Sequence, residues 1–352
     1  RSRSASVKES VDGRIANQLC RTAYRAQQLG VLFNCLAAHH FLRVVSRQRM
    51  IPSAAAITEV QRRYDELLQQ DLENVEAGLY PRSLLFQLPI LDYLKTAPAY
   101  ALDVPRTIRR IKRQDFQDFP DDVTVEDYPA YFRRNFHWQT DGYLSRRSAD
   151  LYDAGVEFLF LGTADVMRRQ VIPAVTQHRR REPAALRLLD VGCGTGRTLH
   201  QLAVAHPTLR YTGLDLSPYY LQHARELLRS VEHLSLVNEP AEEMPFRDAT
   251  FDMVTSVYMF HELPKPVRKR VYREMFRVLR PGGLLVIEDS AQPGDAGAIV
   301  EFLERFSTEF HEPFYRGYLS DDIGDALGRQ GFVDVVTEPC FVSKIVTARK
   351  PG

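Results

Sequence analysis

Apolar residues recur with two different periods along this chain. In the second half, short apolar runs of strand length alternate with longer stretches in which every third or fourth residue is apolar, as in a helix. That alternation is typical of a parallel sheet covered by helices on both faces. The expected strands are residues 185–191, 210–216, 234–237, 251–258, 283–289, 333–337 and 341–348, and the expected helices are residues 198–205, 218–230, 265–279, 299–310 and 319–330.

The first hundred residues show the helical period alone. Val11, Ile15 and Leu19 share one face of a predicted helix that Gly30 ends, and a second helix is expected over residues 31–48. Ser53 is the expected N-cap of a third helix. Its apolar stripe consists of Ile57, Val60, Tyr64, Leu67, Leu68, Leu72, Val75 and Leu79, and Pro81 is expected to end it. Such a stripe packs against the protein's own core, or it forms a homodimer through these N-terminal helices.

The middle of the chain changes character twice. Residues 100–127 are charged and irregular, and the basic run at 109–113 is expected to be a solvated face of a linker or surface helix. Aromatic residues then gather over 128–143, and residues 148–175 have the pattern of an amphipathic lead-in helix. The expected organisation is a disordered tail (1–10), a mainly helical N-terminal domain and linker (11–127), an aromatic-rich lid and lead-in helix (128–180), and the sheet domain (181–352).

The charge balance and the cysteine spacing indicate which classes of partner to expect. The chain has 352 residues, and its 46 lysines and arginines nearly balance 45 aspartates and glutamates, for a formal charge of +1. Nucleic acid is therefore not an expected partner. The cysteines are scattered without metal-site spacing, so we expect no metal. Scattered cysteines also favour a cytoplasmic location. An organelle-targeted precursor that has lost its leader is the alternative. No apolar run is long enough for a transmembrane segment.

Three alternate glycines follow the first expected strand. Asp190 precedes Gly192, Gly194 and Gly196, and a helix begins directly after them. Glycine permits both the turn and the close approach of a ligand to the main chain. The third glycine comes one residue earlier than in the dinucleotide fingerprint, which weakens an NAD assignment. Asp215, nineteen residues after Gly196, ends the next strand and is suited to bind two ribose hydroxyls.

These motifs resemble those of class I S-adenosylmethionine-dependent methyltransferases, in the branch of ubiquinone and menaquinone biosynthesis enzymes. The ordered series comprises Asp190 to Gly196, Gly213 to Pro218, Ala241 to Phe246, Phe251 to Val254 and Arg277 to Gly283. The resemblance implies a Rossmann-like three-layer sandwich with a seven-stranded, mostly parallel sheet, and S-adenosylmethionine as cofactor. The implied donor-binding residues are Asp190, Gly192, Cys193, Gly194, Gly196, Asp215, Leu216, Glu239, Ala241, Met244, Ser256 and Val257.

One position departs from the family pattern. Many relatives have an acid directly before the alanine of the third motif, where it meets the adenine amine, but this chain has Pro240. Glu239 or a backbone carbonyl is expected to replace that acid.

The residues expected near the methyl acceptor lie in three segments. In this family, the residues just before the core domain commonly cover the donor and line the acceptor pocket. The aromatic residues at 128–143 could equally join the helical domain to the core. The acceptor-binding candidates are His137, Trp138, Tyr143, Tyr258, His261, His311 and Tyr315. His261 follows the fourth strand and is the candidate general base, because an unperturbed pKa of about 6.5 suits proton removal near neutrality. A pocket-lining histidine without a catalytic role is the alternative.

Three classes of function remain open at this point. The first is methyl transfer to a small-molecule acceptor by in-line displacement. The second is an RNA- or protein-directed methyltransferase, against which the balanced charge and the sequence Ser256-Val257-Tyr258-Met259 argue, since it lacks the N-P-P-Y type of motif. The third is a donor-binding member of the same fold that does not transfer methyl groups.

Overall fold

A seven-stranded sheet forms the centre of the computed structural model, which describes residues 17–36, 53–88, 90–184 and 186–352. The strand order is β3-β2-β1-β4-β5-β7-β6, and β7 alone runs antiparallel to its two neighbours. The predicted seven-stranded, mostly parallel sheet is confirmed. The strands are β1 (Arg187–Val191), β2 (Arg210–Asp215), β3 (Leu234–Asn238), β4 (Phe251–Val257), β5 (Leu279–Ser290), β6 (Val333–Cys340) and β7 (Ser343–Arg349).

Alternate residues of each central strand enter two separate hydrophobic cores. Leu188, Met253 and Leu284 belong to one core, and their chain neighbours Leu189, Val254 and Leu285 belong to the other. This follows from the two-residue period of a strand, which sends successive side chains to opposite faces. A sheet that is apolar on both faces needs a helical layer on each.

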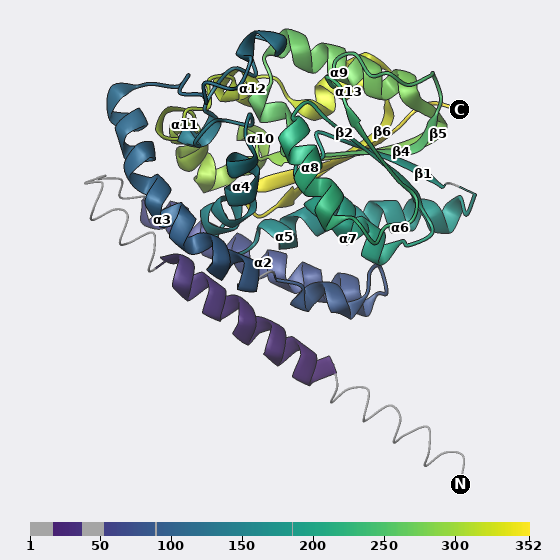
Figure 1. Cartoon of the computed structure of the whole chain (residues 1–352). Coiled ribbons are helices and arrows are strands. Elements are labelled where there is room, and N and C mark those ends of the chain that lie inside the picture. The colour runs from purple at the N-terminus through teal and green to yellow at the C-terminus, as the bar shows by residue number, and fades with distance from the viewer. Residues whose placement is uncertain (1–16, 37–52, 89, 185) are drawn as a thin grey trace.

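Helices cover both faces of the sheet (Figure 1). The first core includes apolar residues of α6 (Ile172–Arg181), α7 (Arg197–Ala205) and α8 (Pro218–Leu227), whereas the second includes those of α9 (Lys265–Val278) and α13 (Ile323–Gln330). The predicted three-layer sandwich is therefore confirmed. The short helices α10 (Pro293–Ala296), α11 (Val300–Glu309) and α12 (Tyr315–Leu319) lie between β5 and α13 in the chain.

The N-terminal helices pack against the first core. Ser53 caps α2 (Ala54–Glu76) as predicted, its hydroxyl accepting from the amide of Ala56. Tyr64 and Leu68 of the predicted stripe are buried in the same hydrophobic core as the sheet residues Leu188 and Met253, whereas Ile57 remains 43% exposed. Further helices are α3 (Ile90–Arg113), α4 (Arg146–Leu159) and α5 (Ala164–Arg168).

A helix over residues 17–36 lies beside α2, at the outer edge of the molecule (Figure 1). It passes through Gly30 without a break, so the predicted helix end at that glycine is wrong. The predicted tail at 1–10 and residues 37–48 of the second predicted helix lie outside the described residues.

A buried carboxylate joins these helices to the rest of the protein. Asp71 of α2 is fully buried and accepts hydrogen bonds from the hydroxyls of Tyr24 (2.5 Å) and Tyr80. Arg169, which follows α5, donates to it through Nε at 2.6 Å. The guanidinium and the two hydroxyls together satisfy the buried carboxylate. These contacts hold three segments of the chain together.

Two local predictions are corrected by the structure. Arg110 in the basic run is buried, since its guanidinium donates to the carbonyl of Trp138 (3.0 Å) and to Thr140 Oγ1 (2.6 Å), so this run is not a wholly solvated face. Residues 280–282, expected to connect a helix ending at 279 to a strand beginning at 283, lie inside β5, where a register shift between β4 and β5 accommodates them. Every helix in the described part of the chain is too short or too polar to cross a membrane.

Candidate functional site

The glycine turn after β1 has a backbone that other residues rarely adopt. Gly192, Gly194 and Gly196 have φ angles of 72°, 53° and 82°, all in the left-handed region. The amides of Gly192 and Cys193 both donate to the carbonyl of Leu214, at 2.8 and 3.0 Å, which anchors the turn to β2. Gly196 precedes α7 and fits closely against α8, where a Cβ atom would lie 3.0 Å from that of Ala224.

Asp215, the last residue of β2, holds the turn from the other side. Its Oδ2 accepts from the Gly194 amide and its Oδ1 accepts from the Ser217 amide, both at 2.8 Å. Burial raises the pKa of Asp215 to about 6, although these two amides oppose the shift. A carboxylate has about four acceptor positions, so Asp215 retains capacity for ligand hydroxyls.

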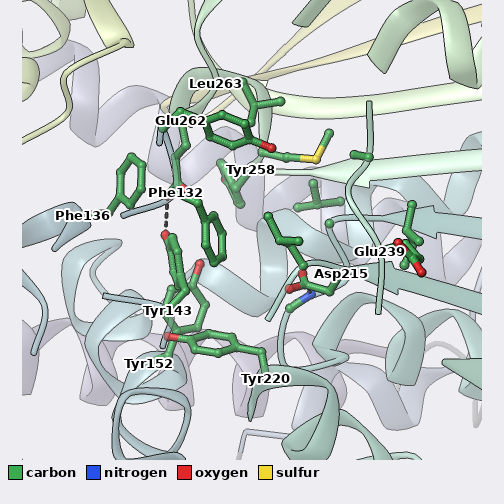
Figure 2. Close-up of a pocket in the computed structure, with 18 residues that line it drawn as sticks. Phe132, Phe136, Tyr143, Tyr152, Asp215, Tyr220, Glu239, Tyr258, Glu262 and Leu263 are labelled. Carbon is green, nitrogen blue, oxygen red and sulfur yellow. Dashed lines mark hydrogen bonds between the residues drawn. The ribbon is translucent and has the colours of Figure 1, made fainter. Parts of the chain in front are cut away.

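A cavity opens at the carboxyl ends of β1, β2 and β4 (Figure 2). This is the edge where ligands bind in open parallel sheets. The lining residues are Tyr131, Phe132, Phe136, Tyr143, Tyr152, Gly192, Gly194, Leu214, Asp215, Leu216, Tyr220, Glu239, Ala241, Val257, Tyr258, Met259, Glu262 and Leu263.

Aromatic rings form the wall opposite the glycine turn. The ring of Tyr143 stacks between those of Phe132 and Phe136, with centroid distances of 5.7 and 5.6 Å. Tyr220 of α8 meets Tyr143 edge to face at 5.3 Å. The segment is fixed to the sheet domain because Ser217 Oγ donates to the Tyr143 carbonyl at 2.5 Å. Figure 2 shows these rings facing Asp215 and Glu239 across the cavity.

Comparison with known proteins identifies the domain that carries this cavity. A family profile described as a methyltransferase domain matches residues 188–283. A demethylmenaquinone methyltransferase of Staphylococcus aureus is 40% identical over 106 residues, which are 30% of this chain and 43% of that protein. The chain carries a class I S-adenosylmethionine-dependent methyltransferase domain. It spans less than half the length of the curated relatives that it matches.

Solved structures similar to this methyltransferase domain are more distant in sequence. A SAM-dependent methyltransferase of Thermotoga maritima is 17% identical, with a TM-score of 0.43 and coverage of 57% of this chain and 96% of that chain. The phosphoethanolamine N-methyltransferase 2 of Haemonchus contortus, solved with phosphomonomethylethanolamine and S-adenosylhomocysteine, is also 17% identical, with a TM-score of 0.40 and coverage of 59% and 61%.

The structure brings seven of the twelve predicted donor-binding residues to the cavity. These seven are Gly192, Gly194, Asp215, Leu216, Glu239, Ala241 and Val257. Glu239 is thus on the cavity wall directly before Pro240, where it can replace the acid that this chain lacks. The contact of each residue with a donor stays a prediction.

The other five predicted donor-binding residues support the methyltransferase domain from behind the cavity wall. Asp190 accepts from Thr255 Oγ1 at 2.7 Å, and Ser256 Oγ donates to the Val191 carbonyl at 2.8 Å. Cys193 packs beneath Gly213, Gly196 packs against α8, and Met244 is buried in the second core. Burial raises the pKa of Asp190 to about 7.

The predicted acceptor-binding residues divide into three groups. Tyr143 and Tyr258 line the cavity. Trp138 and His311 instead contact each other with ring centroids 4.9 Å apart, and Tyr315 is buried with its hydroxyl 2.5 Å from Ser290 Oγ. His137 and His261 lie beyond Glu262, a cavity residue that the sequence predictions did not select.

His261 is fixed by a buried carboxylate. Its Nδ1 lies 2.6 Å from Oδ1 of Asp289, whose Oδ2 accepts from the amides of Met259 and Phe260 at 3.1 and 2.7 Å. Burial alone lowers the pKa of His261, but the charges of Asp289, Glu312 and Glu262 outweigh it and raise that pKa to about 9. The general-base role of His261 stays a prediction.

His137 lies between two glutamates that are distant in sequence. Its Nε2 is 3.0 Å from Glu262 Oε1, and its Nδ1 is 2.9 Å from Glu312 Oε1. The Tyr143 hydroxyl donates to the same Glu262 oxygen at 2.5 Å (Figure 2). His137 also has a φ of 54°, a strained value for a residue with a side chain. An acid adjacent to His261 at the end of β4 is the sequence signal that could have drawn attention to Glu262.

Proposed function

We propose that this protein transfers the methyl group of S-adenosylmethionine to a small-molecule acceptor. The supporting observation is that a single cavity joins the glycine turn and Asp215 to a wall of aromatic rings. The polar side has the groups expected to bind a nucleoside and an amino acid moiety. The aromatic side offers a mostly apolar surface with a few hydroxyls, which suits a small organic acceptor.

The residues of the cavity fit the donor. Asp215 has acceptor capacity for ribose hydroxyls, Glu239 is available for the adenine amine, and Gly194 leaves the main chain uncovered on the cavity side, since a Cβ atom there would have Tyr220 as its nearest neighbour at 4.0 Å. The donor, once bound, supplies a methyl group already activated on a sulfonium. The protein's task is therefore to align the acceptor and exclude water.

Two further observations favour a small acceptor over a macromolecule. The aromatic residues Phe132, Phe136 and Tyr143 line the cavity, which suits a small organic molecule, and the formal charge of +1 gives no general attraction for RNA. The Staphylococcus aureus relatives are named for a small acceptor, demethylmenaquinone. Because the similarity covers 106 residues, the identity of this protein's acceptor is not carried over.

The decisive experiment supplies donor with a labelled methyl group and extract separated into small-molecule and macromolecular fractions. Wild-type protein is expected to label a low-molecular-weight product, and the Asp215→Ala variant is expected to label little. Label in RNA or protein would replace this proposal with a macromolecule-directed activity. Donor binding without labelled product in any fraction would identify a member of the fold that does not transfer methyl groups.

The predicted homodimer through the N-terminal helices also remains a proposal. The helix over residues 17–36 exposes four large apolar side chains, which supports an apolar contact there. They are Leu19 (65% exposed), Leu29 (61%), Phe33 (72%) and Leu36 (50%). The molar mass of the full chain in solution tests this proposal.

A further inference from the structure

Four side chains with metal-ligand chemistry converge beside the cavity. One ligand atom from each of His137, His261, Glu262 and Glu312 lies within 4.8 Å of the other three. They come from three separate segments: the 3₁₀ turn Phe136–Trp138, the 3₁₀ turn Phe260–Glu262 after β4, and the connection between α11 and α12. The segments are far apart in sequence, so the convergence is a product of the fold.

His261 and Glu262 are each oriented by a hydrogen bond to a residue outside the cluster. His261 Nδ1 pairs with Asp289 at 2.6 Å, which directs its other nitrogen, Nε2, toward Glu262 Oε1 at 3.9 Å. The Tyr143 hydroxyl donates to Glu262 at 2.5 Å. Metal-binding histidines commonly hydrogen-bond to a carboxylate through the nitrogen that does not bind the metal. Metal-binding carboxylates commonly accept a hydrogen bond from a nearby donor.

Glu312 provides an independent observation. It is 1% exposed, and among the described residues neither of its carboxylate oxygens has a hydrogen-bond donor. His137 Nδ1 lies 2.9 Å from Glu312 Oε1, yet the two atoms lack the alignment of a hydrogen bond. A buried carboxylate without aligned donors is costly unless a cation neutralises it. His137 and Glu312 each also place a ligand atom within 4.8 Å of those of His261 and Glu262.

We propose that His137, His261, Glu262 and Glu312 bind one divalent metal ion. Two neutral imidazoles and two carboxylates supply a charge of −2, which matches the ion. Imidazole with carboxylate suits Zn²⁺, Mn²⁺ or Fe²⁺ better than Mg²⁺ or Ca²⁺, which prefer oxygen ligands alone. Bond lengths of about 2.0–2.2 Å require the most widely separated ligand atoms, now up to 4.8 Å apart, to approach each other.

The site would adjoin the cavity, because Glu262 and Tyr143 line it. A metal ion there would be placed to bind a polar oxygen of the acceptor and hold it near the donor. This role rests on the proposed function, whereas metal binding itself does not. The sequence expectation of no metal rested on local spacing, which does not detect ligands brought together from three segments.

Metal titration of the chelator-treated full chain tests the proposal without donor or acceptor. Zn²⁺ and Co²⁺ are each expected to bind at one equivalent, with Zn²⁺ abolishing the visible absorption of bound Co²⁺. Glu312→Gln and His137→Gln are expected to weaken binding tenfold or more. The matched controls Glu243→Gln and His233→Gln change exposed residues outside the cluster and are expected to bind as wild type does.

Crystals of wild-type protein soaked in Zn²⁺ provide a measurement that needs no variant. An anomalous peak between the four side chains is the expected result, at about 2.0–2.2 Å from their ligand atoms. Absence of the peak, or equal metal affinity in wild type and in the two cluster variants, overturns the proposal. The four groups would then be a protonated histidine pair neutralising two glutamates. Donor titration of the same protein shows separately whether the proposed function fails.

Discussion

At the scale of single residues, two carboxylates beside the glycine turn differ in their partners. Asp215 is held by two backbone amides and retains acceptor capacity, whereas Asp190 has one donor, the Thr255 hydroxyl at 2.7 Å. Both pKa values are raised by burial, to about 6 for Asp215 and about 7 for Asp190. Asp190 therefore supports the glycine turn largely as a neutral acid below pH 7.

The raised pKa of Asp190 predicts that the free energy of unfolding depends on pH. The folded chain keeps the Asp190 proton up to about pH 7, but the unfolded chain releases it near pH 4. The stabilisation from Asp190 is therefore complete below pH 4 and is lost as pH rises toward 7. In the Asp190→Asn variant, we expect the free energy of unfolding to fall about 2 to 3 kcal/mol less than in wild type between pH 5 and 7.

Urea unfolding of both proteins at several pH values measures this slope. The amide oxygen of asparagine can still accept from Thr255, so the comparison isolates the titration. Parallel slopes for wild type and Asp190→Asn would show that Asp190 is ionised in the folded protein.

Single residues also show where sequence reasoning was sufficient. Gly192, Gly194 and Asp215 could be placed in one site because strand ends of a parallel sheet meet at a single edge. Glu262 and Asp289 could not be paired with His137 and His261, because no periodicity specifies which loops meet above the sheet. The burial of Arg110 was likewise invisible, since a charged run gives no sign of the carbonyl that accepts from it.

At the scale of elements, the N-terminal helices depend on one polar contact within an apolar interface. Asp71 receives Arg169 and the hydroxyls of Tyr24 and Tyr80 in a fully buried position. Removing its carboxylate leaves a buried guanidinium and two hydroxyls without their acceptor. Losing one partner of a buried ion pair costs about 3–5 kcal/mol.

The Asp71→Ala variant is therefore expected to lose about 3–5 kcal/mol of unfolding free energy. The exposed Asp65 lies on the same helix, and Asp65→Ala is expected to change stability by less than about 0.5 kcal/mol. Chemical denaturation of the three proteins measures both effects. A loss below about 1 kcal/mol for Asp71→Ala would mean that solvent or a rearranged side chain replaces the carboxylate.

The order of the elements was largely predictable, and their ends were less so. Alternation of apolar runs and helical segments located all seven strands, because buried parallel strands are short and apolar on both faces. Gly30 looked like a helix end, yet the helix continues through it, since contacts with α2 compensate for glycine's weak helix propensity. The irregular start of β5 lies outside the expected strand because Pro281 and Gly282 also fit a connection between elements.

At the scale of the whole molecule, the sheet domain shares one core with the N-terminal helices and one cavity with the aromatic segment. Tyr64 of α2 and Leu188 of β1 belong to the same hydrophobic core, and the cavity takes its walls from both the glycine turn and the aromatic segment. In the proposed function, the methyltransferase domain binds the donor and the preceding aromatic segment contacts the acceptor. That segment lies outside residues 188–283, which match the family profile.

The central claim is that the cavity after β1 binds S-adenosylmethionine. Calorimetric titration of the full chain with S-adenosylmethionine, and with NAD in parallel, tests it most directly. We predict one equivalent of S-adenosylmethionine, no heat with NAD, and binding weakened by about 1.5–3 kcal/mol in Asp215→Ala. The exposed-site control Asp122→Ala is expected to match wild type. Binding of NAD in this cavity, or no binding of S-adenosylmethionine, would contradict the account.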